Sequence, residues 1–391
     1  MSRMAVTSAR HEAAPAAASD VPVARVAPVP GSGPSGRPSR VAVVGAGLAG
    51  CTLARALADA GRDVTVLDKA RGPGGRLSTR RVEPQGWTFD HGAVALGARA
   101  PAWRQALAGW AAQGAVAAWS PRLAPDSVQP LDGAALWVGL PGMAGLCRHL
   151  LHGQTDARPL ELLARHQVLA LERDADGRWW LPVQRDEAAP LDGEARAAAL
   201  PQAPRCGPYD TVVLSLPPAQ AASLLDPWRA DWAHEARSTV LRPAWSLMAV
   251  VDDGPDAPDW ALAWPADGPL AVLARDDVKP GRAMHPGQQR WVIQSTADWS
   301  AQHLADRPEA VADALVAAAG RWLGPRRWLH TSAHRWAYAT SVRAMVSPER
   351  RARWDAALGL GLCGEALGGG GAEGAWASAQ AAAAVSGAAG S

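Results

Sequence analysis

The sequence is poor in lysine and in two of the three aromatic residues. Lys69 and Lys279 are the only lysines among 391 residues, and every other cationic side chain is arginine. Phe89 is the one phenylalanine and there are two tyrosines, against 19 tryptophans. The formal net charge is only +2, so nothing favours nucleic acid or an anionic membrane as the main partner. We expect tryptophan to fill the usual aromatic positions of core and pocket.

Cysteine is also scarce, and the four cysteines are far apart. Cys51, Cys147, Cys206 and Cys363 form no Cys-x-x-Cys pair and show no Cys/His spacing that suits a metal. This pattern predicts a reduced, cytoplasmic protein without a metal site.

Long apolar runs are missing too. No stretch approaches the ~18 uninterrupted apolar residues that a bilayer-spanning helix needs, and the N-terminal segment lacks the apolar core of a secretory signal. Residues 1–39 are rich in Ala, Pro and Ser. We interpret them as a disordered leader, or as the result of a start codon assigned too early.

What is present predicts a globular protein with a sizeable core, because 48% of the residues are hydrophobic. The length suggests two domains or one large composite domain. Residues 40–61 read RVAVVGAGLAGCTLARALADAG. An apolar run at Val41–Val44 predicts a buried strand, and the spacing from Leu53 to Ala58 predicts a helix. A second strand over 64–67 makes this the start of a parallel sheet.

The rest of the chain changes character at about residue 228. Before it we expect a helix over 142–151, two strands over 166–183 with a turn at Asp176–Gly177, and a strand, a Pro-Pro break and a helix over 209–225. Between Trp228 and Trp354, Trp-bearing strands alternate with turns, which predicts antiparallel pairing interrupted by one helix, PEAVADALVAAAG. A strand, a glycine tract and a helix of small residues end the chain.

The glycine pattern Gly45-x-Gly47-x-x-Gly50 lies between the first strand and the first helix. In a dinucleotide-binding turn the first glycine allows the tight bend, the second lets the backbone approach a pyrophosphate, and the third lets helix and strand pack closely. Asp68 ends the second strand, where a carboxylate can accept both ribose hydroxyls. The alternative is a structural glycine turn with an acid at the surface.

A second glycine loop, GPGGR, follows Asp68 directly. Gly74 and Gly75 can bring backbone N–H groups close to a ligand, and Arg76 can add a charge-assisted contact. This is what an extended FAD needs, because its pyrophosphate must be held from more than one side. An exposed glycine loop is the alternative, and Lys69 is either a second cation of the site or solvated.

These motifs resemble a known family. The stretches VAVVGAGLAG, VTVLDKARGPGGRLSTRR and FDHGA are similar to the amino end of FAD-dependent oxidoreductases of the amine-oxidase type, and look closest to bacterial renalase-like proteins. The resemblance continues over 273–315 and 334–339 and in the terminal CGEALGGGGAEGAWASAQAAA. It covers most of residues 40–385.

The resemblance implies an α/β fold with two domains. A Rossmann-type FAD-binding domain, with a parallel sheet and a β-meander, would be assembled from residues 40–96, 136–222 and 346–391. A mainly antiparallel α+β substrate domain would comprise 97–135 and 223–345.

The resemblance also implies how FAD would be held, without a covalent link. Val168 would meet the adenine through its backbone. Gly364 and Glu365 correspond to the family's Gly-Asp near the ribityl chain, with Glu in place of Asp. Gly374 and Ala375 would open the last helix, after Glu373, and point its N–H groups at the flavin. The full set expected to bind the cofactor is Gly45, Ala46, Gly47, Leu48, Ala49, Gly50, Asp68, Lys69, Gly74, Gly75, Arg76, Val168, Gly364, Glu365, Glu373, Gly374 and Ala375.

Three residues are candidates for the chemistry. Lys279 would lie near flavin N5 in the amine-oxidase pattern, with a surface cation as the alternative. His91 and Gly92 would lie near the ring, although Val94-Ala95-Leu96 replaces the polar and aromatic residues usual after FDHGA, and a structural histidine is the alternative for His91. His334, Gln294, Trp291 and Trp336 are candidates for a lid over the ring, although core packing is the favoured interpretation for both tryptophans.

Three functions follow from the resemblance. The first is a flavin oxidase that takes hydride from a reduced small molecule, such as a dihydronicotinamide isomer of NAD(P)H, and passes the electrons to O2. The second is an amine oxidase or desaturase acting on another small metabolite. The third is a flavin-binding protein without turnover.

Overall fold

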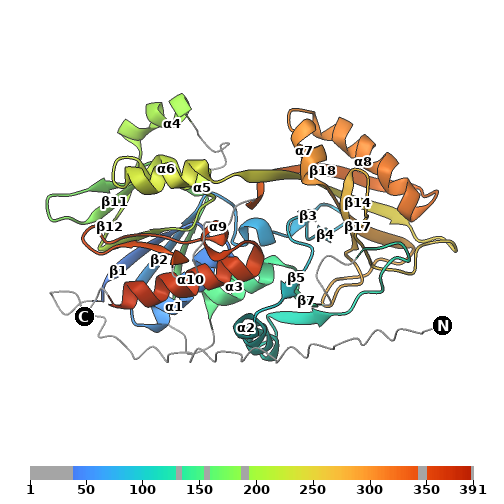
Figure 1. The fold of residues 1–391 in the computed structure, drawn as a ribbon, viewed down its shortest axis with the longest axis horizontal. Coiled ribbons are helices and arrows are strands. Elements are labelled where there is room, and N and C mark those ends of the chain that lie inside the picture. Colours follow the sequence, from blue (N-terminus) through green and yellow to red (C-terminus); the bar gives the residue numbers. More distant parts are fainter. Residues whose placement is uncertain (1–37, 129–133, 154–158, 186–192, 342–349, 389–391) are drawn as a thin grey trace, which may run out of the picture.

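The computed structural model describes residues 38–128, 134–153, 159–185, 193–341 and 350–388. Its six-stranded sheet, at the left in Figure 1, has the strand order β19-β20-β13-β1-β2-β8. These strands are β1 (Arg40–Val44), β2 (Asp63–Asp68), β8 (Glu161–Ala164), β13 (Thr211–Leu214), β19 (Arg353–Asp355) and β20 (Leu360–Leu362).

This sheet is parallel except at its β19 edge. Strand β1 lies between β2 and β13 and is buried on both faces. Val41 and Val43 enter one hydrophobic core, and Ala42 and Val44 enter another, because successive side chains of a strand point to opposite faces. A strand covered on both sides can therefore be apolar throughout, as the sequence predicts.

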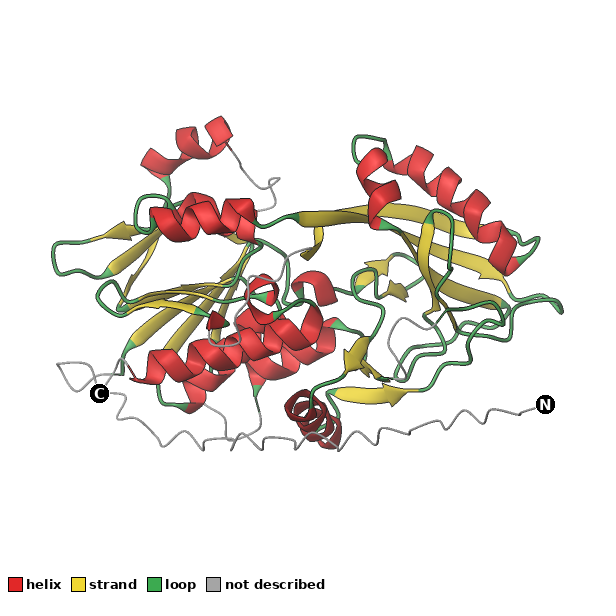
Figure 2. Cartoon of the chain, in the orientation of Figure 1, coloured by secondary structure: helices red, strands yellow, loops and turns green. Residues whose placement is uncertain are grey.

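Helices cover both faces of this sheet (Figure 2). One face is covered by α1 (Leu48–Asp59), α3 (Ala144–His152) and α10 (Gly371–Ala388), and the other by α5 (Pro218–Leu225) and α6 (Ala230–Ser238). The short α9 (Glu365–Gly368) precedes α10, and α4 (Gly193–Ala199) lies outside these layers. Helix α2 (Pro101–Ala112) contacts α10 through Trp103 and Trp376, whose rings are 5.6 Å apart.

The described chain also contains three smaller sheets. The first contains β9 (His166–Val168), β10 (Glu172–Arg173), β11 (Trp179–Arg185) and β12 (Arg205–Tyr209). The second pairs β3 (Arg80–Val82) with β4 (Trp87–Phe89). The third contains β5 (Leu96–Ala98), β6 (Val116–Trp119) and β7 (Ala135–Gly139). Two short 3-10 helices span Gly75–Leu77 and Leu200–Gln202.

A five-stranded antiparallel sheet lies at the right of Figure 1, in the order β15-β16-β17-β14-β18. Helix α8 (Pro308–Leu323) covers one of its faces and shares a core with it, and α7 (Ala297–Gln302) packs near β14. The strands are β14 (Leu241–Asp252), β15 (Leu262–Ala263), β16 (Leu270–Arg275), β17 (Gln288–Ser295) and β18 (Trp328–Ser341).

The predicted α/β architecture is confirmed: a parallel sheet comes first and an antiparallel sheet follows after residue 228. The turn at Asp176–Gly177 is present, with Gly177 at φ +77°. One boundary was wrong, because the last helix begins at Gly371 rather than at Gly374. The Glu365 carboxylate accepts the Gly371 N–H at 3.2 Å, so a buried acid supports the helix start within the glycine tract.

Other predictions of organisation stay predictions. Residues 1–37 lie outside the described residues, and the described chain already packs at Ser39, whose carbonyl accepts the Asp63 N–H at 3.0 Å. The proposed domain boundaries are not tested by the sheets alone. In the described part of the chain, no helix combines the length and the apolarity that crossing a membrane requires.

Trp291 lies in the core and not in a lid, which is the interpretation that sequence analysis favoured. Its side chain is fully buried, its ring lies 4.8 Å from that of Trp260, and its Nε1 donates to Gln289 at 3.1 Å. The alternation of β17 explains why Gln294 differs. Gln294 lies on the opposite face of the strand, where it reaches Gly92.

We predict that Trp291→Ala lowers the free energy of unfolding by about 3–5 kcal/mol, as expected for truncation of a buried tryptophan. Urea denaturation of both proteins measures the difference. Tyr338→Ala, which removes an exposed aromatic side chain from β18, is the control and is expected to change it by less than about 1 kcal/mol. Equal effects of the two substitutions would contradict the core placement.

Candidate functional site

The first glycine loop leaves β1 for α1 in a bend that needs two of its glycines. Gly45 has φ +110°, and a Cβ there would lie 2.3 Å from the carbonyl oxygen of Ser215. A Cβ on Gly50 would lie 1.9 Å from the Gly45 oxygen. Gly47 differs, because a Cβ on it meets nothing within 4 Å. Gly45 and Gly50 therefore serve close packing, whereas Gly47 faces open space.

Asp68 joins this loop to the end of β2. Its Oδ2 accepts the Ala46 N–H at 2.6 Å and its Oδ1 accepts the Ala70 N–H at 2.7 Å. Burial raises the pKa of the Asp68 carboxyl, and the two N–H groups oppose that shift. Helix α1 then begins at Leu48 with no side chain capping its first N–H groups. Such a helix start can bind an anion.

The second glycine loop lies directly against the first. Gly74 pairs with Gly47 in an isolated parallel bridge, and its N–H donates to the Ala46 carbonyl at 2.8 Å. Gly74 and Gly75 have φ of +138° and +52°, and a Cβ on Gly75 would lie 3.2 Å from the Gly47 Cα. Two predicted loops that are separated in sequence thus form one backbone surface.

Arg76 and Glu365 connect this surface to the carboxyl end of the chain. Arg76 Nη1 donates to Glu365 Oε2 at 2.9 Å and to the Ala339 carbonyl at 3.2 Å. Glu365 is buried, and its Oε1 accepts the Ser341 hydroxyl at 2.8 Å. The longer acid noted in the sequence therefore binds the end of β18 and the start of α10 at once.

Three further residues that were expected to bind the cofactor lie in three different parts of the fold. Lys69 is exposed and contacts Gln220 at 3.3 Å. Val168 is buried in β9, opposite Val183 of β11, and β9 lies beside β2. Gly364 follows β20 with φ +156°, and its N–H donates to the Ser378 hydroxyl of α10 at 2.9 Å.

Glu373, which was expected among the cofactor-binding residues, contacts the start of α2. Its carboxylate accepts the N–H groups of Arg99 at 3.1 Å and Ala100 at 3.0 Å, so it binds the start of α2. Gly374 packs against the end of α9, because a Cβ on it would lie 3.0 Å from the backbone carbonyl of Gly368. Ala375 is buried against the same core as α1.

His91, His334 and Trp336 form an aromatic cluster beside Arg76. The His91 ring lies 4.9 Å from His334 and 5.1 Å from Trp336. Trp336 Nε1 donates to the His91 carbonyl at 2.9 Å, and the Gln294 amide donates to the Gly92 carbonyl. His91 Nδ1 is buried and has no hydrogen-bond partner among the described residues.

Both histidines of this cluster are held neutral. Burial lowers the pKa of His91 to about 3, and His334 and Arg80 add to the effect. Burial and Arg80 lower the pKa of His334 to about 4. A neutral imidazole offers one donor and one acceptor. The cluster thus presents an uncharged, hydrogen-bonding aromatic face.

Lys279 does not occupy the position expected of a flavin-facing lysine. Its side chain is completely buried, and its ammonium contacts the carboxylates of Asp90 at 3.4 Å and of Asp276. The Trp119 ring covers it at 5.5 Å. Asp90 lies 189 residues away in sequence, so no local pattern could reveal the pairing. The expected catalytic role of Lys279 conflicts with this enclosure.

Asp90 and Arg282 were missed by sequence analysis, although both adjoin motifs that it used. Asp90 precedes His91 in FDHGA, and Arg282 lies three residues after Lys279, within the 273–315 part of the resemblance. Both side chains are buried and bonded to each other. The signal available in the sequence was that each of these charged residues lies in a short motif that also contains a glycine.

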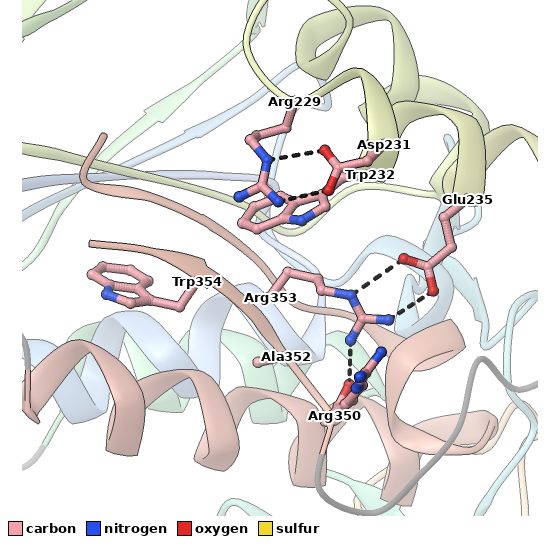
Figure 3. Close-up of a pocket in the computed structure, with 8 residues that line it drawn as sticks. All are labelled: Arg229, Asp231, Trp232, Glu235, Arg350, Ala352, Arg353 and Trp354. Carbon is pink, nitrogen blue, oxygen red and sulfur yellow. Dashed lines mark hydrogen bonds and ion pairs between the residues drawn. The ribbon is translucent and has the colours of Figure 1, made fainter. Parts of the chain in front are cut away.

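A separate cleft of about 550 Å³ lies between α6 and the β19 edge (Figure 3). Arg229 binds Asp231 and Asp355, and Arg353 binds Glu235. These ion pairs join α6 to the edge strand. The residues that line the cleft include none of those expected to bind a cofactor: they are Arg229, Asp231, Trp232, Glu235, Arg350, Ala352, Arg353 and Trp354.

Comparison with known proteins supports the nucleotide-binding part of this description. A family model described as an NAD(P)-binding Rossmann-like domain matches residues 43–110. The chain is 46% identical to an L-amino acid oxidase of Bothrops pictus over 59 residues, and this stretch covers 15% of this chain and 12% of that protein. Over 60 residues it is 45% identical to an L-amino-acid oxidase of Mus musculus, 15% of this chain and 10% of that protein. The chain thus spans about a tenth of the length of these relatives.

Solved structures extend the likeness to most of the chain. A putative protoporphyrinogen oxidase from Exiguobacterium sp. has a TM-score of 0.60 at 14% identity, covering 89% of this chain and 98% of that one. The chain shares the fold of these oxidases. Wild-type putrescine oxidase bound to putrescine has a TM-score of 0.59 at 12% identity, again covering 89% and 98%.

We predict that Gly47→Ala weakens FAD binding by about 10-fold or more, because a methyl group would enter the space where backbone approaches a pyrophosphate. The thermal midpoint should be unchanged, since the new Cβ meets no protein atom. Titration of the apoprotein with FAD, followed by fluorescence, measures the affinity. Gly109→Ala, also in open space but on α2, is the control. An unchanged FAD affinity in Gly47→Ala would contradict the assignment of this loop.

We also predict that the His91 and His334 rings do not titrate between pH 5.5 and 8, as followed by their C2–H resonances. Both folded pKa values lie below the ordinary value of 6.5, so the unfolded chain binds more protons. Their contribution to stability is therefore full above pH 6.5 and is lost as the pH falls towards 4. Denaturation in that window should show His91→Gln to be less pH-dependent than the parent. Titration of either ring near pH 6.5 would contradict the buried cluster.

Proposed function

We propose that this protein is a non-covalent FAD-dependent oxidoreductase that oxidises a small molecule. The contact of the two glycine loops at Gly47 and Gly74 carries the proposal. It gives a backbone surface at the carboxyl end of β1, beside an uncapped helix start and a carboxylate at the end of β2. That is the combination which holds a dinucleotide pyrophosphate and its ribose.

The residues present fit such a cofactor. Gly45, Gly47 and Gly50 would follow the pyrophosphate, and Asp68 would meet the ribose. Arg76 is partly exposed and would add a charge-assisted contact. FAD bound there would supply a hydride acceptor. The protein's part is to orient the reactant and to exclude water.

The reactant would bind at the face made by His91, His334 and Trp336. That face is aromatic and uncharged, and it has an unpaired buried nitrogen on His91. Asp90 is the acid whose charge raises the pKa of His91, but its carboxylate already pairs with Lys279 and Arg282 rather than with a reactant. An uncharged ring with polar substituents, such as a dihydronicotinamide isomer of NAD(P)H, suits this face better than an ammonium group.

An amine is the second candidate for the reactant. The sequence matches over the nucleotide-binding part are to L-amino acid oxidases, and putrescine oxidase shares the fold. The Trp336 ring at the site could contact a substrate amine in its neutral form. In either case O2 is the proposed electron acceptor and the cytoplasm the proposed location.

The division of the chain belongs to the same proposal. Residues 40–96, 136–222 and 346–391 would bind FAD, and 97–135 and 223–345 would cover the reactant. A flavin-binding protein without turnover is the remaining alternative. It is supported by Val94-Ala95-Leu96, which replace polar and aromatic residues beside His91.

Anaerobic mixing of the FAD-loaded protein with candidate reductants tests these alternatives. We expect dihydronicotinamide isomers to bleach the flavin band near ~450 nm, an absorbance that belongs to the cofactor, and primary amines to leave it unchanged. Bleaching by amines alone would favour the second candidate, and no bleaching by any reductant would favour the third. A purified protein that takes up no FAD would overturn the proposal itself.

A further inference from the structure

Four buried charged residues meet where the loop that follows β16 contacts the residue after β4. Asp90, Asp276, Lys279 and Arg282, here called the Asp90 cluster, have side-chain exposures of 0%, 1%, 0% and 1%. Two carboxylates and two cations give a formal net charge of zero. Burial alone would raise the pKa of Asp90, but Lys279 and Arg282 outweigh it and hold the pKa at about 2.

Asp90 is the centre of the cluster because both of its carboxylate oxygens and its backbone N–H make contacts with other residues. Its Oδ1 accepts the Thr79 hydroxyl at 2.7 Å and the Met143 N–H at 2.9 Å. Its Oδ2 contacts Lys279 and Arg282. Its backbone N–H donates to Asp276 Oδ2 at 3.0 Å. Three distant stretches of chain therefore fix one residue.

The loop that supplies the cations is itself held to the antiparallel sheet. The Asp276 N–H donates to the Arg290 carbonyl at 2.6 Å, and Asp277 Oδ1 accepts the Arg290 N–H at 2.8 Å. Arg282 Nη1 donates to the Gly139 carbonyl at 2.7 Å. The loop that carries Lys279 and Arg282 to Asp90 is thus hydrogen-bonded to β17 and to the end of β7.

The residues after Asp90 carry the proposed reactant face. The carbonyls of His91 and Gly92 accept from Trp336 and Gln294, and the Ala93 N–H donates to the Arg76 carbonyl at 2.8 Å. A Cβ on Gly92 would lie only 2.0 Å from that same carbonyl. A displacement of Asp90 would therefore move the His91 ring and the Arg76 loop together.

We propose that Asp276, Lys279 and Arg282 are positioning residues, which act through Asp90 to hold His91 against His334 and beside Arg76. The proposal rests on the proposed function, because it takes the face at His91 as the reactant site. It assigns Lys279 a role without contact to reactant or cofactor. Removal of the Lys279 charge leaves two buried carboxylates opposite one guanidinium, an imbalance that disturbs the segment. Removal of the Asp276 charge as well restores the balance.

The test is a double-mutant cycle in the FAD-loaded protein, with Lys279→Met, Asp276→Asn and the two combined. The amide oxygen of Asp276→Asn can still accept the Asp90 N–H. The exposed ion pair Arg321–Asp267, 3.3 Å apart, provides the matched control as Arg321→Met, Asp267→Asn and their combination. The first measurement is the C2–H titration of His91, assigned by its loss in His91→Gln.

The groups that act on the His91 ring are His334 from β18, Arg80 from β3, and Phe89 and Asp90 from its own segment. We expect His91 to begin titrating at a pH at least one unit higher in Lys279→Met and to return to the parental behaviour in the double variant. The control variants should leave it unchanged. An unaltered His91 titration in Lys279→Met, or no return in the double variant, would overturn the proposal.

The second measurement is the rate of flavin reduction by the reductant that bleaches the parent protein. We expect a loss of about 100-fold in Lys279→Met, as small misplacements can cause, and recovery in the double variant. If Lys279 touched the reactant, the double variant would stay as slow as the single one. The titration needs no reductant, so a failure of the proposed function leaves the positioning role decidable.

Discussion

The close approach of two glycine loops is the constraint on which the rest of the structure depends. Gly45 and Gly50 leave no space for a side chain, and Gly74 hydrogen-bonds to Ala46 across the gap between the loops. This contact fixes where β1 ends and where α1 begins. It also places Arg76 within reach of Glu365, from the opposite end of the chain. One backbone arrangement thus shapes the proposed nucleotide site and connects it to the carboxyl end of the chain.

Buried charge has a role complementary to that of apolar packing. Apolar packing alone lets surfaces slide, whereas a bonded carboxylate such as Asp90 accepts few geometries. The structure combines both: one apolar core includes residues of β1 and of β16, and the Asp90 cluster joins the loop after β16 to the end of β4. The Arg76–Glu365 pair and the Asp90 cluster lie on two sides of the segment that carries His91. His91 and His334 stay neutral mainly because burial lowers their pKa values.

Sequence analysis located the parts of the site that depend on local backbone chemistry. Gly45, Gly47, Gly50, Asp68 and Gly74 could be found because turns and strand ends restrict residue type over a few positions. Residues whose partners are distant in sequence could not be placed. Lys279 needs Asp90, and Glu373 needs the N–H groups of Arg99 and Ala100. Trp291 and Gln294 were both candidates for the lid, but alternate faces of β17 carry them, so Trp291 enters the core and Gln294 reaches Gly92.

The order of the strands has a consequence for biosynthesis. Strand β1 is made early, but β20, α9 and α10, which complete its sheet and cover α1, belong to the carboxyl end. A ribosome must therefore release almost the whole polypeptide before β13 gains its outer neighbour β20 and α1 gains the helix that covers it. Until then the apolar face of α1 stays open to other chains. Such non-local closure slows folding and favours aggregation, so chaperone supply and translation speed should govern the yield of this protein.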